Sequence, residues 1–168
     1  MALATPLPIP RSIPRNHRRA LDVLLSTRRD PALLCARVVL GLVMFSHGAQ
    51  KVLGWFGGGG PGATITSFEQ HLGLPSILAV LVMAAEFLGG LGLIAGLLSR
   101  VAAGGIVLVM FGAVALVHAR LGWFMNWTGT QAGEGIEYHL LAIALGIVVF
   151  MRGGGACSVD RVLARRVL

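Results

Sequence analysis

The strongest constraint on this chain is an apolar run of 23 residues, Ser76–Leu98, that contains a single charged side chain, Glu86. A helix that crosses a bilayer needs about 20 mostly apolar residues, because lipid offers no hydrogen-bond partner for backbone polar groups. A second run, from Val101 to about Ala119, contains no charged residue. Charged residues make up only 12% of the chain, whereas a soluble domain has about 25%. The sequence therefore predicts a polytopic membrane protein and excludes a soluble or disordered one.

Two further segments are predicted to span the membrane. Ala32–Phe56 is apolar but contains Arg37 and Lys51 near its two ends, and we expect both side chains to extend towards the membrane surfaces. The last span runs from about Ile136 to Met151. The predicted fold is thus all-α, a four-helix transmembrane bundle. It would occupy residues 31–152, between a flexible Arg- and Pro-rich tail (1–30) and a basic C-terminal tail (153–168).

The basic residues predict the orientation of these spans. Cytoplasmic segments of membrane proteins carry an excess of Lys and Arg. In a four-helix topology only Lys51 and Arg120 fall on one side, and the other twelve basic residues fall on the opposite side: Arg11, Arg15, Arg18, Arg19, Arg28, Arg29, Arg37, Arg100, Arg152, Arg161, Arg165 and Arg166. We therefore expect a multi-pass protein of the plasma membrane with both termini in the cytoplasm. Because the arginines follow the topology in this way, they do not indicate nucleic-acid binding.

A short helix is expected between the first two spans, on the outer membrane surface. The glycine-rich run Gly57–Gly62 is read as irregular. Thr66 and Glu69 then match a capping box, which predicts a helix start at that point. Gly73, just before Pro75, predicts its end.

Glycines inside the spans are interpreted as packing positions. Membrane helices lack a hydrophobic drive to associate, so small residues allow their backbones to approach closely. Gly41 and Gly48 lie in the first span, and Gly92-x-x-x-Gly96 in the second has a spacing typical of such contacts.

Ionisable side chains inside the spans are the most informative feature for function. Glu86 lies about 15 Å below the outer start of its helix at a rise of 1.5 Å per residue. An ionised carboxylate at that depth costs at least about 3 kcal/mol unless it has a partner or faces a wet cavity. The expected topology places six such groups in the outer half of the bundle: Glu86, His47, Lys51, His118, Glu137 and His139.

One interpretation of this cluster is a polar pocket with Glu86 at its floor. His and Glu side chains exchange protons near neutral pH, and such a pocket suits a ligand with carbonyl or hydroxyl groups, such as a quinone head group. The alternative is structural, with interhelical hydrogen bonds that set helix register. Depth favours function for Glu86, leaves His47 and Lys51 open, and favours structure for the shallower His118, Glu137 and His139.

Two other chemistries are disfavoured. The histidines could ligate a b-type haem or a metal, but they lack a motif spacing, and Lys51 would oppose a cation. Cys35 and Cys157 do not form a C-x-x-C pair and would face a reducing compartment, so they are interpreted as small apolar fillers.

A set of short motifs, in a fixed order over residues 33 to 163, gives the chain a family resemblance. These motifs are Arg37, Gly41, His47-Gly48 and Lys51; Gly73-Leu74-Pro75; Glu86-x-x-Gly89-Gly90; Gly96-Leu97-Leu98-Ser99-Arg100; His118; Glu137-Tyr138; and Gly153-x-Gly155-x-x-Ser158-x-Asp160. In this pattern the chain resembles the DoxX family of small membrane proteins. The resemblance implies a four-helix bundle and a link to quinone-dependent redox chemistry. It also implies functional roles for Arg37, His47, Lys51, Glu86, His118 and Glu137.

The leading hypothesis is a quinone-linked oxidoreductase component without a covalently bound cofactor. Glu86 and His47 would relay protons and Lys51 would stabilise developing negative charge. His118, Glu137, His139 and Arg37 would bind substrate. The alternative is a non-catalytic membrane anchor or assembly subunit for a soluble redox enzyme, and a proton-coupled transporter, which would need a dimer, is a weaker third. The expected partners are the lipid bilayer, a quinone or quinol, a soluble redox protein on the cytoplasmic side and a second copy of the chain.

Overall fold

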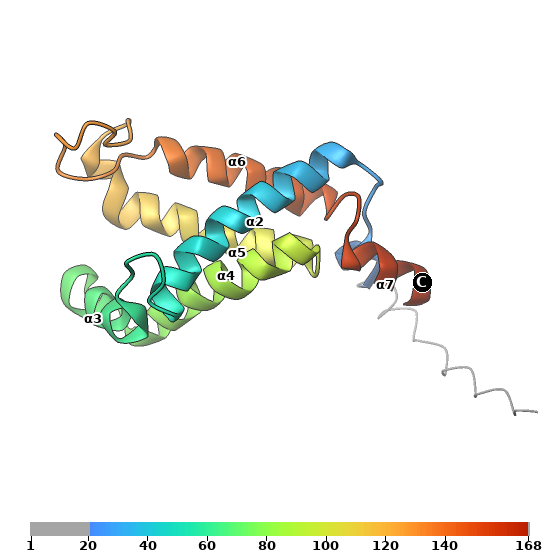
Figure 1. Ribbon diagram of the computed structural model, residues 1–168, viewed down its shortest axis with the longest axis horizontal. Coiled ribbons are helices and arrows are strands. Elements are labelled where there is room, and N and C mark those ends of the chain that lie inside the picture. The colour runs from blue at the N-terminus through green and yellow to red at the C-terminus, as the bar shows by residue number, and fades with distance from the viewer. Residues whose placement is uncertain (1–20, 168) are drawn as a thin grey trace, which may run out of the picture.

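The described part of the chain is built of helices connected by short segments (Figure 1). A computed structural model describes residues 21–167, so most of the expected N-terminal tail lies outside the described residues. No strand occurs within that range, and the predicted all-α class is confirmed. The helices are α2 (Pro31–Val52), α3 (Gly60–Leu72), α4 (Ser76–Ala95), α5 (Ser99–Ala113), the π-helical turn η1 (Val114–His118), the 3-10 turn η2 (Ala119–Leu121), α6 (Glu137–Arg152) and α7 (Val159–Val167).

Three helical segments are long and apolar enough to cross a membrane: Pro31–Val52, Ser76–Ala95 and the continuous run Ser99–Leu121. They coincide with three of the predicted spans to within a few residues. The fourth predicted span corresponds to α6, which has 16 residues and is therefore shorter than the other three. The molecule is elongated, with α3 near one end and α7 at the other, and these positions define the α3 end and the α7 end (Figure 1).

Local sequence explains where several helices begin and end. Asp30 caps α2, since its carboxylate accepts a hydrogen bond from the backbone N–H of Ala32 at 2.8 Å. α3 ends as predicted at Gly73, whose φ of +64° is a left-handed conformation that favours glycine. Its predicted start is wrong, because α3 begins at Gly60 instead of near Thr66. Pro61 lies in its first turn, where proline is favoured, and this outweighs the poor helix propensity of the glycines around it.

α2 lies alongside α4, and α6 packs against both α2 and α5 (Figure 1). The core between these four helices contains Leu40 and Met44 of α2, Leu93 of α4, Ile106 of α5 and Val149 of α6. α3 contacts α4 and α2 at the α3 end. This packing leaves many leucines and phenylalanines exposed on the outer faces of the helices, as expected where the surroundings are lipid.

Glycines set the close crossing of α2 and α4. A Cβ atom at Gly41 would lie 3.0 Å from the carbonyl oxygen of Gly90, and one at Gly90 would lie 2.5 Å from the Phe45 nitrogen. A Cβ atom at Gly48 would overlap the Phe87 backbone. The packing role expected for Gly41 and Gly48 is confirmed.

Gly96 is closely packed, as expected, but against the segment after α6: a Cβ atom there would lie 2.7 Å from the Ser158 Cα. Gly96 also caps the C-terminus of α4 with a φ of +71°, so the Gly92-x-x-x-Gly96 spacing includes the end of a helix. Gly90, two residues earlier than Gly92, takes the packing position against α2.

We expect Gly48→Ala to destabilise the protein by about 1–3 kcal/mol, because the added methyl group meets backbone atoms that cannot rotate away. The measurement is the unfolding midpoint in lipid or mild detergent. Gly112→Ala is the matched control, since a Cβ atom there meets nothing within 4 Å. Equal midpoints for the two variants would contradict the close crossing.

Buried polar side chains hold the α7 end together. The expectation that Arg37 extends to the membrane surface is wrong, because its side chain is fully buried. Its guanidinium donates to the carbonyls of Leu93 and Ile94 in the last turn of α4, and to three carbonyls in the segment after α6: Gly154, Ala156 and Cys157. Helix ends leave carbonyls without partners, and Arg37 satisfies those of two chain segments at once.

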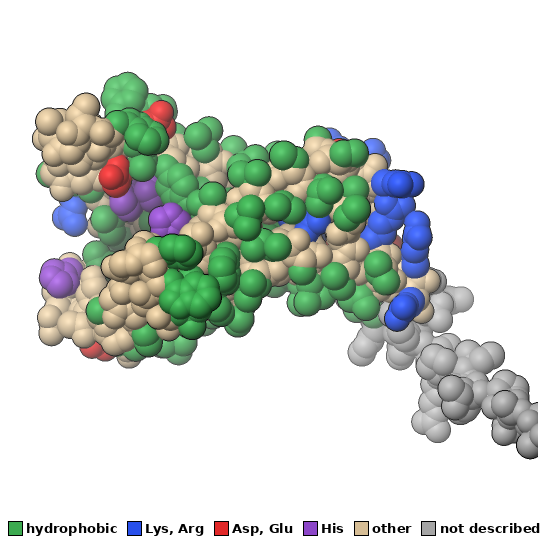
Figure 2. All heavy atoms as spheres, viewed as in Figure 1, with side chains coloured by type: hydrophobic (Ala, Val, Ile, Leu, Met, Phe, Trp, Pro, Cys, Tyr) green, Lys and Arg blue, Asp and Glu red, His purple; other side chains and the backbone are tan. Residues whose placement is uncertain are grey.

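Asp160 satisfies backbone N–H groups at the start of α5, as Arg37 satisfies carbonyls at the end of α4. Its carboxylate accepts hydrogen bonds from the backbone N–H groups of Leu98, at 2.6 Å, and Ser99, at 2.9 Å. A carboxylate at a helix N-terminus satisfies free N–H groups and matches the helix dipole. Exposed arginines surround this end, and Figure 2 shows Lys and Arg side chains gathered there.

Candidate functional site

A cavity of about 720 Å³ lies in the half of the molecule that includes the α3 end. Its walls are mostly apolar side chains of α3, α4, α5 and η1, and Figure 2 shows the molecule hollowed at this end, with histidine side chains at the hollow. A volume of this size is typical of small-molecule sites. The polar and charged residues that line it are His47, Lys51, Glu86, His118, Glu134, Tyr138 and His139.

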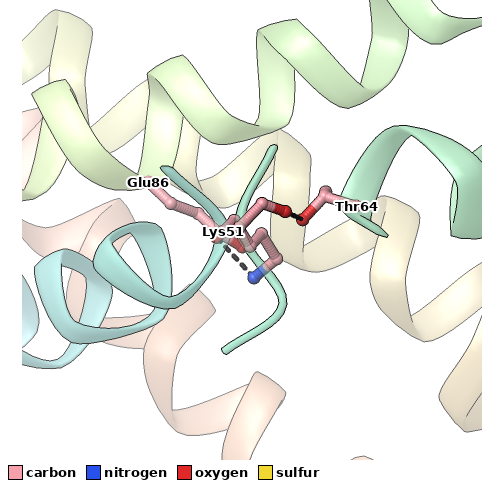
Figure 3. Close-up of polar contacts among 4 residues, drawn as sticks. Lys51, Thr64 and Glu86 are labelled. Atoms are coloured by element: carbon pink, nitrogen blue, oxygen red, sulfur yellow. Dashed lines mark hydrogen bonds and ion pairs between the residues drawn. The ribbon is translucent and has the colours of Figure 1, made fainter. Parts of the chain in front are cut away.

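An ion pair forms part of the cavity wall. Lys51 Nζ donates to Glu86 Oε2 at 2.6 Å (Figure 3). The Glu86 side chain is only 5% exposed and that of Lys51 is 28% exposed, so the carboxylate is enclosed while the lysine is partly accessible from the cavity that it lines. The close approach of Gly48 to α4 brings the two helices together beside this pair. The pairing explains how a carboxylate is accommodated inside an apolar span.

A row of rings lies across another wall of the cavity. The ring centroids of His47 and Tyr138 are 5.8 Å apart, those of Tyr138 and His139 are 5.2 Å apart, and those of His139 and His118 are 4.0 Å apart. The row joins α2, the start of α6 and η1. His118 is also fixed by a hydrogen bond of 2.7 Å between its Nδ1 and the Glu134 carbonyl.

Two buried polar atoms in this row have no hydrogen-bond partner among the described residues. They are the Tyr138 hydroxyl and Nδ1 of His139. Leaving a buried polar group unpaired costs about 1–3 kcal/mol. Both residues line the cavity, so a ligand with its own hydrogen-bonding atoms can satisfy them.

A π-helical turn shapes the remaining wall. In η1 the backbone N–H of Ala119 bonds to the carbonyl of Val114, five residues earlier. Such a turn shifts the register of the helix, and π turns inside α-helices occur frequently at functional sites. Leu116, Val117 and His118 lie within this turn and line the cavity.

The structure brings five of the seven predicted site residues together at the cavity: His47, Lys51, Glu86, His118 and His139. Glu137 does not line it. Its carboxylate accepts a hydrogen bond of 3.2 Å from the Met125 N–H and so braces the segment between η2 and α6. Arg37 lies among the carbonyls of the α7 end and does not line it either.

Sequence reasoning missed Tyr138, Glu134 and the π turn. Tyr138 is the single tyrosine of the chain and lies between two predicted site residues, which is a signal that could have identified it. No comparable signal marks Glu134 or the π turn. Within residues 21–167, no three His, Cys, Asp or Glu side chains are grouped so that they could hold a metal ion.

Comparison with known proteins agrees with the motif pattern. The DoxX family model matches residues 32–119. "Uncharacterized membrane protein Rv3486" of Mycobacterium tuberculosis is 32% identical over 149 residues, which cover 85% of this chain and 88% of the relative. "Inner membrane protein YqjF" of Escherichia coli is 26% identical over 141 residues, covering 82% and 95%.

A third relative has a name that refers to an activity. "Putative oxidoreductase CatD" of Bacillus subtilis is 32% identical over 93 residues, which cover 55% of this chain and 64% of the relative. No solved structure matches the chain. The family match covers more than half of the sequence, and a relative of similar length is a membrane protein. This chain is therefore a membrane protein that belongs to the DoxX family.

Proposed function

We propose that this DoxX protein is a quinone-linked oxidoreductase component that crosses the membrane four times. α6 would be the fourth span, because it packs against α2 and α5, which are both long enough to cross. α3 would lie at the outer surface, since it packs beside α4 at the end away from the arginines. The excess of basic residues at the α7 end supports cytoplasmic termini. This topology puts the cavity in the outer half of the membrane.

The observation that carries the proposed activity is the pairing of an apolar cavity with unpartnered polar atoms on its wall. A quinone has an apolar ring and two carbonyl oxygens, each of which accepts hydrogen bonds. The Tyr138 hydroxyl can donate to one of them, and Nδ1 of His139 donates as well when it carries the ring proton. The relative named as an oxidoreductase is consistent with redox chemistry at such a site.

The charged residues of the cavity would serve proton transfer. Reduction of a quinone to a quinol consumes two electrons and two protons. In this proposal the two electrons come from a soluble reductant that reaches the cavity from the outer membrane surface, and Glu86 and His47 relay protons to the quinone oxygens. Lys51 stabilises negative charge as it develops on the head group. The ion pair holds the Glu86 carboxylate at the cavity wall, next to the Lys51 ammonium.

Tyr138→Phe tests this proposal because it removes only the unpartnered oxygen. We expect the affinity for a short-chain benzoquinone to fall about tenfold, the effect of one lost hydrogen bond. We expect protein stability to stay equal or rise, because a buried polar atom without a partner disappears. Binding would be measured by equilibrium titration of the purified protein in lipid nanodiscs.

Ser46→Ala is the matched control, since the Ser46 hydroxyl bonds the Leu42 carbonyl of its own helix and does not line the cavity. A quinone that binds wild type and Tyr138→Phe equally would remove the observation on which the proposal rests. Absence of any quinone binding to wild type would reject the proposal entirely.

The exposed arginines of the α7 end favour the second candidate, a membrane anchor for a soluble redox enzyme. Arg28, Arg29, Arg152, Arg165 and Arg166 are exposed there, and such a patch attracts an acidic partner. A pull-down that recovers a stable soluble enzyme, together with unchanged activity of that enzyme when Glu86→Gln is introduced, would favour this candidate.

A further inference from the structure

We propose that the ligand of the cavity arrives through the lipid and enters sideways, between α4 and α5. Its polar head would lie against Tyr138 and His139, and an aliphatic chain would extend past Leu81 and Leu108 into the bilayer. This inference rests on the proposed function and names its substrate class, a quinone with a long isoprenoid or alkyl chain.

The spacing of α4 and α5 opens towards the α3 end. Near their shared turn the helices are in contact, since a Cβ atom at Gly89 would lie 3.7 Å from the Ile106 side chain and one at Gly105 would lie 3.7 Å from Ala85. Two turns further along α5, a Cβ atom at Gly112 would meet nothing within 4 Å. The two helices therefore form a wedge, and the cavity occupies its wide part.

The rim of this wedge is apolar and highly exposed. Leu81 on α4 is 56% exposed and Leu108 on α5 is 74% exposed, although both line the cavity. Leu108 lies nine residues after Ser99, about 14 Å along the helix at 1.5 Å per residue. In a hydrocarbon core about 30 Å thick, that depth is close to the middle of the membrane. The rim thus faces lipid tails, where a water-soluble ligand is scarce.

The polar groups of the cavity lie away from its apolar rim, which suits an amphiphile that enters through the rim with its polar head first. Tyr138 and His139 are carried by α6, and the ion pair by α2 and α4, whereas the apolar residues of α5 form much of the rim. Phe68 and Leu72 of α3 add an apolar cover over the end of the cavity. An elongated molecule with one polar end therefore matches the distribution of polar and apolar walls.

Gly112→Leu is designed to fill the wide part of the wedge. The added side chain starts in open space, so we expect the variant to fold as wild type does. The probes are 2,3-dimethoxy-5-methyl-1,4-benzoquinone and its 6-decyl derivative, titrated in nanodiscs with affinities expressed per mole of lipid. We expect wild type to bind the decyl probe at least tenfold more tightly than the chainless probe. Gly112→Leu should lose most of that preference.

Gly62→Leu is the control, because a Cβ atom at Gly62 also meets nothing and this residue of α3 does not line the cavity. A wild type that binds both probes equally, with no effect of Gly112→Leu, would overturn the lateral opening and leave the proposed quinone function standing. A wild type that binds neither probe would overturn the proposed function itself.

A measurement on the unmodified chain provides a second test. A benzoquinone with a photoreactive diazirine at the end of its alkyl chain should label residues on the outward faces of α4 and α5 around Leu81 and Leu108. Labelling confined to the segment between η2 and α6 would contradict the proposal, because it would place the chain at the membrane surface.

Discussion

Replacing Arg37 by methionine should lower the free energy of unfolding by about 3–5 kcal/mol, the range found when one partner of a buried charged network is removed. Methionine has a similar volume but donates no hydrogen bond. The carbonyls of Leu93, Ile94 and Gly154 would then lose their hydrogen bonds from the guanidinium, and Asp160 would lose a nearby positive charge. The effect should be measured as the unfolding midpoint of the purified protein in mixed micelles.

Arg152→Met is the matched control for Arg37→Met. Arg152 is exposed at the same end of the molecule, and substitutions at such positions usually change stability by about 0.5 kcal/mol or less. Arg37→Met should also leave quinone affinity per folded molecule unchanged, because Arg37 does not line the cavity. Equal midpoints for the two variants would show that Arg37 does not join the helix ends.

Replacing Lys51 should lower the free energy of unfolding more than replacing its partner Glu86. Lys51→Met leaves an enclosed carboxylate without its partner, and we expect a loss of about 3 kcal/mol. Glu86→Gln leaves a lysine that is 28% exposed and therefore less enclosed than the carboxylate, so we expect a loss of only about 1 kcal/mol. The double variant Lys51→Met/Glu86→Gln should recover part of the larger loss, because no unpaired charge remains inside.

Activity should respond differently from stability in the same variants. All three should lose about 10²-fold or more of quinone-dependent turnover, since each lacks a proton-relay or charge-stabilising group. The combination of recovered stability with lost turnover in the double variant would separate function from structural support. Full turnover in the double variant would instead assign the pair to helix packing alone.

The fold was largely predictable because the bilayer acts on local composition. Each backbone polar group inside lipid must bond within its own helix, so long apolar runs and their interruptions locate α2, α4 and α5 without any knowledge of contacts. Gly73 was predictable for an equally local reason, since a left-handed helix end favours glycine. Counting residues along each helix also predicted that His47, Lys51 and Glu86 lie at one depth, although Glu137, predicted at the same depth, does not line the cavity.

Direction around each helix axis could not be obtained in this way. Arg37 looked free to reach the surface, but the folded chain turns it inward, because carbonyls from α4 and from the segment after α6 meet beside it. Tyr138 joined the already predicted His139 as a candidate only when the packing of α6 enclosed the polar atoms of both residues. The composition of a segment determines whether it enters lipid, because each helix satisfies its own backbone hydrogen bonds there. The contents of the cavity wall depend on several helices packing together, and no single segment encodes that arrangement.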